Sequence, residues 1–141
     1  MNIYNTFIYQ LLICYLLSLC IGIERQYRKS VGLRTIILVS IGSFLFVRFS
    51  FLSSNNDITR IASQIASGIG FLGAGLIIKD EKAVKGLTTS ATLWCSSAIG
   101  VLCSGGLLIE ASIGTIMILL TNIVLKTIDN KINTIHKDDE K

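Results

Sequence analysis

The chain has 141 residues, of which 51% are hydrophobic and only 16% are charged, and its mean hydropathy is +0.65. This composition excludes an ordinary soluble domain and predicts a protein embedded in a lipid bilayer. The formal net charge of +4 comes from basic loops, as described below, so it indicates a membrane topology and not binding to nucleic acid.

Five apolar segments predict an all-α bundle of membrane-spanning helices, because about 20 residues of helix cross a hydrocarbon core. In the first segment the basic residues follow the apolar run, whereas a cleaved signal peptide has them before it, so this segment is expected to stay attached. The second is the weakest, since Arg34 and Arg48 flank a short uncharged run. The predicted spans are about 3–23, 33–52, 58–78, 87–103 and 107–128, with a polar cytoplasmic tail at 129–141.

If the five spans alternate across the membrane, the loops divide between its two sides, and the basic residues fall mainly in the loops of one side. All of the 13 Lys and Arg residues except Arg48 and Arg60 then lie on one side. Because basic loops stay on the cytoplasmic side, the N-terminus is predicted outside and the C-terminus in the cytoplasm. We therefore expect a multi-pass protein of the bacterial inner membrane.

The connection between the first two spans, GIERQYRKSVGLRT, holds a candidate polar network. Glu24 and Arg25 end the first helix, and Arg34 and Thr35 begin the next. Across this short loop, Glu24 can form an ion pair with Arg34, next to Thr35. The alternative is that the basic residues only anchor the helices at the membrane surface, which does not explain the carboxylate.

The third span begins with NNDITRIASQ, which places a polar stripe at the outer end of the helix. Asp57 is positioned to cap the helix and to pair with Arg60, and Gln64 extends the stripe inward. A capped, salt-bridged helix start explains these residues. A polar entry feature for an ion is the alternative.

The same span contains SGIGFLGAG, in which GIGFLG has the G-x-G-x-x-G spacing of a dinucleotide site. That site needs a strand before the glycines, and here they lie inside an apolar run, so nucleotide binding is not expected. Small residues allow helices to pack closely in lipid. We predict that this helix is the central, most crowded one and contacts its own chain or a second copy, and a break around an ion is the alternative. The candidate packing residues are Gly68, Gly70, Gly73, Ala74 and Gly75.

Hydroxyl and thiol side chains share one face of the fourth span. At about 100° per residue, Thr88, Thr92 and Cys95 fall within a narrow arc that Cys103 extends. Such a face suits hydrogen bonds to a neighbouring helix, so the first three are candidates for packing or partner binding. The four cysteines form no C-x-x-C pair and predict neither a disulfide framework nor a zinc site.

Catalysis is not expected, because the single histidine, His136, lies in the tail and no nucleophile has an evident base. No cofactor is predicted, and magnesium is the ion that the chain is expected to bind or transport, if any. The carboxylates close to the spans, and hence the candidate magnesium ligands, are Glu24, Asp57 and Glu110.

The sequence leaves two functional hypotheses open. The first is a non-enzymatic regulator whose slender helices dock with another copy of the chain or with a different membrane protein. The second is an oligomeric magnesium transporter or channel, in which symmetry converts single carboxylates into rings. The scarcity of carboxylates at membrane depth favours the regulator.

Four blocks of the sequence resemble the MgtC/SapB family of bacterial inner-membrane proteins. Together they cover most of residues 22–106 in the order of the family, and the ordered set is highly specific. The blocks are GIERQ at 22–26, GLRT at 32–35, RIASQIASGIGFLGAGLIIKD at 60–80 and KGLTTSATLWCSSAIGVLCSGG at 85–106.

The resemblance implies a five-span domain linked to growth under magnesium limitation and, in intracellular pathogens, to virulence through survival in host phagocytes. Members similar to the virulence factor bind and restrain the proton-translocating ATP synthase, which makes that enzyme a possible partner here. Two departures stand out. The soluble cytoplasmic domain that many relatives carry after the spans is absent, so the chain is expected to be a short form, and Thr88 replaces the Asn of the virulence factor.

Overall fold

The computed structural model describes residues 3–27, 32–53, 57–80 and 83–128. Within these ranges it contains five α-helices and one short hairpin. The hairpin lies between the third and fourth helices. The last helix continues into one π-helical turn, in which each turn holds more residues than in an α-helix. The elements are α1 (Ile3–Tyr27), α2 (Leu33–Leu52), α3 (Ile58–Ala74), β1 (Ile78–Asp80), β2 (Ala83–Lys85), α4 (Leu87–Ser104), α5 (Leu108–Leu120) and η1 (Thr121–Leu125).

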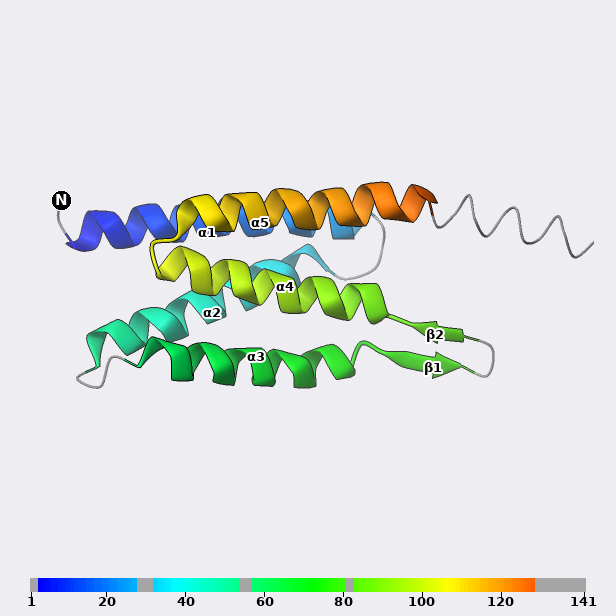
Figure 1. Cartoon of the computed structure of the whole chain (residues 1–141), viewed down its shortest axis with the longest axis horizontal. Coiled ribbons are helices and arrows are strands. Elements are labelled where there is room, and N and C mark those ends of the chain that lie inside the picture. Colours follow the sequence, from blue (N-terminus) through cyan, green and yellow to red (C-terminus); the bar gives the residue numbers. More distant parts are fainter. Residues whose placement is uncertain (1–2, 28–31, 54–56, 81–82, 129–141) are drawn as a thin grey trace, which may run out of the picture.

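The five helices lie side by side, and consecutive helices run in opposite directions (Figure 1). The start of α1 and the end of α5 therefore lie at opposite ends of the bundle. The hairpin β1–β2 extends from the same end as the end of α5. In this hairpin Ile78 pairs with Lys85, and the Lys85 Nζ atom lies 3.9 Å from the Asp80 carboxylate.

The prediction of an all-α membrane bundle is confirmed. In the described part of the chain, four helices are long and apolar enough to cross a membrane, namely Tyr4–Tyr27, Leu33–Leu52, Leu87–Ser104 and Leu108–Ile128. The third predicted span, 58–78, is not among them. Its helix α3 has 17 residues, about 26 Å at 1.5 Å per residue, and ends at Ala74, after which the backbone turns into β1.

Helix α4 occupies the centre of the bundle, because it contacts each of the other four helices. Its buried face consists mostly of small residues, which allow a close approach. At Gly100 an added Cβ would collide with the Ser40 carbonyl oxygen of α2, and the Ser40 hydroxyl donates a hydrogen bond of 2.8 Å to the Ser96 carbonyl. The apolar core around this contact comprises Cys14, Ile21, Ile36, Phe44, Leu93, Ile99, Cys103 and Ala111.

The prediction that the third helix is the central one is wrong within the chain. α3 packs mainly against α4 and α2, and Gly73 is its buried residue. A side chain added at Gly68 or Gly70 would meet nothing within 4 Å. The physical reason is that α4 presents small residues on the face toward its neighbours and takes the central place, which leaves most of the small residues of α3 on the outer surface.

Candidate functional site

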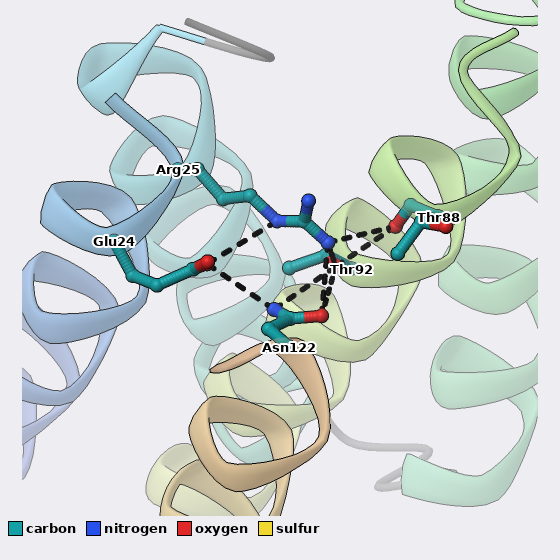
Figure 2. Close-up of polar contacts among 5 residues, drawn as sticks. All are labelled: Glu24, Arg25, Thr88, Thr92 and Asn122. Atoms are coloured by element: carbon teal, nitrogen blue, oxygen red, sulfur yellow. Dashed lines mark hydrogen bonds and ion pairs between the residues drawn. The ribbon is translucent and has the colours of Figure 1, made fainter. Parts of the chain in front are cut away.

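A buried arginine at the end of α1 organises the polar contacts of the bundle. The Arg25 side chain is 5% exposed and lies between α1, α4 and the end of α5 (Figure 2). A guanidinium group cannot lose its charge in a protein, so burying it requires partners for its charge and its N–H groups. We refer to the residues that supply them as the Arg25 cluster, which consists of Glu24, Arg25, Thr88, Thr92 and Asn122.

The guanidinium joins three helices. Its Nη2 donates hydrogen bonds of 3.0 Å to the Thr88 carbonyl of α4 and of 3.0 Å to the Asn122 side-chain oxygen, and it also contacts the Thr92 hydroxyl. Its Nε lies 3.4 Å from a carboxylate oxygen of Glu24, which is 8% exposed. The positive charge thus meets an adjacent negative charge and three oxygen acceptors, as charge-assisted bonding in a low-dielectric interior requires.

The amide of Asn122 bridges the two charged groups. Its oxygen faces the guanidinium, and its nitrogen donates a hydrogen bond of 3.3 Å to Glu24. Asn122 belongs to η1, where the wider turn buries this residue although its neighbours Thr121 and Ile123 are exposed. π-helical turns often occur at functional positions, and here the turn presents one amide to both ions.

The hydroxyl of Thr92 completes the cluster on α4. It donates a hydrogen bond of 2.9 Å to the Thr88 carbonyl, one turn earlier, while it accepts from Arg25. The carbonyl of Thr88 therefore receives two donors. On the face of α4 predicted to bond to other helices, Thr92 contacts Arg25 of α1 through its hydroxyl and Thr88 does so through its backbone carbonyl, whereas Cys95 is half-buried.

The expected ion pair between Glu24 and Arg34 is not formed. Arg34 and Thr35 are exposed at the start of α2, and the Glu24 carboxylate contacts Arg25 and Asn122 instead. The reason is geometric: Arg25 lies on the buried face of α1, next to α4 and α5. The end of α1 and the start of α2 are linked by a different contact, in which the Gln26 side-chain oxygen accepts a hydrogen bond of 3.1 Å from the Leu33 N–H.

The start of α3 is capped by Asp57, as predicted. Asp57 accepts hydrogen bonds from the Arg60 backbone N–H at 3.0 Å and from the Thr59 hydroxyl at 2.9 Å, and it lies 3.5 Å from Arg60 Nε. The bond from the Arg60 N–H, followed by that from Thr59, lowers the pKa of Asp57 below its ordinary value. The pair is largely exposed, and Gln64 lies on the surface where it lines a groove between α2 and α3.

The three candidate magnesium ligands do not come together. Glu24 lies at the end of α1, whereas Asp57 and Glu110 begin α3 and α5 at the opposite end of the bundle (Figure 1). Glu110 is exposed. Among the residues that the structure describes, no group of three or more His, Cys, Asp or Glu side chains could hold a metal ion.

The predicted packing residues fall into two sets. Gly73 faces α4, where an added Cβ would collide with the Ser90 side chain. Gly68, Gly70, Ala74 and Gly75 are exposed on α3. Asn122 was not predicted, although one signal for it exists in the sequence: it is the amide inside the otherwise apolar segment IMILLTNIVL, and polar groups at such depth usually have a function.

The sequence model of the MgtC family matches residues 11–131, a range that includes all five members of the Arg25 cluster. The chain belongs to the MgtC family. This MgtC family member is 52% identical over 114 residues to Protein MgtC of Brucella abortus, with 79% of the chain and 48% of that protein covered. It is 48% identical over 128 residues to Protein MgtC of Salmonella typhimurium, with 90% and 55% covered.

An uncharacterized protein of Synechocystis is 48% identical over 132 residues, with 92% of the chain and 56% of that protein covered. The chain thus spans about half the length of the curated relatives it matches. No solved structure gives a significant match. The resemblance to the MgtC/SapB family, inferred from the four sequence blocks, is confirmed.

Proposed function

We propose that this MgtC family member is a non-enzymatic regulator of the bacterial inner membrane that serves adaptation to low magnesium. It acts by helix–helix association, with another copy of itself or with a membrane partner, for which the ATP synthase is the candidate that the family resemblance suggests. The observation that carries this proposal is the exposed row of small residues on α3.

This row follows one side of the helix at steps of four, three and four residues. It consists of Ser63, Ser67, Gly70 and Ala74, and all four are exposed. Small residues give lipid tails little to pack against, but they let another helix approach closely enough for backbone contacts. Most small residues of α4 are covered by the chain's own helices, so α3 is the helix on which a continuous row of small residues remains available for association.

The Arg25 cluster supports a regulatory role in a second way. Its carboxylate, guanidinium and amide bond to one another and hold α1, α4 and α5 together. A group in a transport path must instead exchange its partners for the passing ion, and magnesium in particular requires several oxygen ligands while it retains its waters. The cluster is therefore better suited to fixing the shape of a docking surface than to conducting an ion.

The test compares Gly70→Leu with Ala91→Leu, which enlarges an exposed small residue of α4 and serves as the matched control. We expect Gly70→Leu to abolish co-purification of a differently tagged second copy, or of ATP synthase subunits, and to abolish growth at low magnesium in a strain that depends on the chain. Ala91→Leu should retain both. If both variants behave like the wild type, the association surface is not on α3.

Liposomes distinguish the regulator from the oligomeric magnesium transporter. Purified protein is reconstituted with an enclosed magnesium dye, and uptake is compared with that of empty liposomes. We expect no uptake above this background. Robust uptake that Glu24→Ala or Asp57→Ala abolishes would overturn the regulator in favour of the transporter.

A further inference from the structure

A cavity of about 580 Å³ lies between the start of α4 and the end of α5, next to the Arg25 cluster. Its volume is in the range of sites that hold small molecules or a lipid headgroup. Polar and apolar side chains both contribute to the wall. The residues that matter for its chemistry are Arg25, Thr88, Thr89, Thr121, Asn122 and Lys126.

The charges on the wall of this cavity are positive. Arg25 and Lys126 are the formally charged residues among its described lining, and Arg25 is 95% buried. Glu24, whose carboxylate lies 3.4 Å from the Arg25 Nε and offsets part of its charge, lines a separate cavity with Cys20, Ile23 and Tyr27. α4 also begins at this cavity, so the positive end of its dipole adds to the two cations.

Neutral hydrogen-bonding groups accompany the two cations. Thr88, Thr89 and Thr121 line the wall, and a threonine hydroxyl can donate to an oxygen anion. The wall is fixed on the side of the hairpin, because Gly86 has a φ of +89° and an added Cβ there would collide with the Leu76 carbonyl. Two cations and several hydroxyls around a preformed space are the chemistry of a phosphate site.

The position in the bundle agrees with this chemistry. The cavity lies at the end that also carries the hairpin with Lys79 and Lys85 (Figure 1). Basic pockets between membrane helices, at the level of the lipid headgroups, bind anionic phospholipids. We propose that this cavity, framed by Arg25 and Lys126, binds a phosphate-bearing anion, either the headgroup of an anionic phospholipid or free phosphate. The site lies apart from the α3 surface, whose exposed small residues carry the regulatory proposal.

The experiment uses the full chain purified in a neutral detergent, with thermal unfolding as the readout, because a ligand that binds the folded state raises the melting temperature. The probes are dioleoyl phosphatidylglycerol, dioleoyl phosphatidylcholine and inorganic phosphate, with sodium chloride at matched ionic strength. The variants are Lys126→Gln and Thr89→Val. The control is Lys79→Gln, which removes an exposed lysine at the same end outside the cavity.

We expect phosphatidylglycerol to stabilise the wild type and Lys79→Gln equally. Lys126→Gln should weaken its apparent affinity about fivefold, the effect of one lysine near an anionic headgroup, and Thr89→Val should weaken it by a smaller factor. If inorganic phosphate alone stabilises the chain and displaces the lipid, free phosphate is the source of the anion. If it does neither, the source is the headgroup.

Two results would overturn the proposal. One is equal affinity for phosphatidylglycerol in the wild type, Lys126→Gln, Thr89→Val and Lys79→Gln. The other is the absence of stabilisation by both phosphatidylglycerol and phosphate beyond the sodium chloride control. Because Lys126 is exposed and lies on the last helical turns, its substitution is compatible with folding, and the comparison remains informative.

Discussion

Helices α3 and α4 have similar compositions and opposite environments. Both are rich in Gly, Ala and Ser. Most small residues of α4 are buried against its neighbours, and an added Cβ at Gly100 would collide with the backbone of α2, whereas Gly70 of α3 faces open space. The same contrast holds for charged groups, since Arg25 is buried beside α4 and Arg60 is exposed at the start of α3. A small-residue pattern therefore predicts that a helix packs closely, but not whether its partner lies in the same chain.

The largest expected difference between the two environments concerns the arginines. Arg25→Met should destabilise the fold by about 3–5 kcal/mol, because it breaks a buried ion pair by removing one partner. Arg60→Met, the matched change in an exposed pair, should have little measurable effect. Unfolding of the purified chain in detergent checks both. The double variant Glu24→Gln with Arg25→Met should recover part of the loss, and equal effects of the two single variants would contradict the contrast.

The second comparison makes one substitution at two glycines. Gly100→Ala should destabilise the bundle by about 1–3 kcal/mol, because the new methyl group forces α2 away from α4. Gly70→Ala should be neutral, or stabilise by up to about 1 kcal/mol through helix propensity, since the methyl group meets no neighbour. Melting temperatures measured in the same detergent decide the matter. Destabilisation of similar size at both positions would mean that α3 is also packed.

A third comparison isolates the hydroxyl of the Arg25 cluster. Thr92→Val preserves shape but removes one acceptor of the buried guanidinium, so we expect a loss of about 1–2 kcal/mol. Thr127→Val is the control, because Thr127 is exposed and its hydroxyl donates one turn back, to the Ile123 carbonyl. Its effect should be close to zero, as measured by the same unfolding experiment.

The smallest expected effect concerns pH and the start of α3. The pKa of Asp57 is lowered in the folded state from 3.8, by hydrogen bonds from the Arg60 N–H and the Thr59 hydroxyl. A lowered folded pKa means that the contribution of Asp57 is present above 3.8 and is lost as the pH falls through the folded pKa. Melting temperatures between pH 6 and pH 3 should show this loss for the wild type. Asp57→Asn should flatten that part of the curve, and an unchanged slope would contradict the assignment.

Much of the fold could be predicted from the sequence, because a long apolar segment in lipid must satisfy its backbone hydrogen bonds internally, as a helix does. The helices α1, α2 and α4 begin and end within a few residues of their predicted spans, except that α1 continues to Tyr27. The fifth predicted span, 107–128, comprises α5, which ends at Leu120, and its continuation η1. The end of α3 was less predictable. The run from Ile61 to Ile78 is uncharged throughout, but the pairing of β1 with β2 across the turn, which depends on the chain on both sides, ends the helix at Ala74.

The residues of the candidate site could be predicted better than the contacts between them. Glu24, Arg25, Thr88 and Thr92 were all singled out from residue type and helical position. Their pairing was missed because a one-dimensional pattern shows which residues share a helix face but not which face meets which neighbour. Asn122 was missed for a further reason: regular 100° steps place it correctly only if the helix is regular, and η1 departs from that regularity.

The wide turn η1 holds about one residue more than an ordinary helical turn. If one residue were removed from it and the helix returned to α-geometry, the side chains beyond would keep nearly the same direction around the axis, because the wide turn and the shorter α-helical segment sweep similar angles. Lys126 would then stay on the wall it shares with Arg25, while the Asn122 amide would lose the wide turn that presents it to the two charged side chains. A deletion in η1 should therefore disturb the Arg25 cluster alone, whereas a deletion in the regular part of α5 should rotate everything beyond it by about 100°.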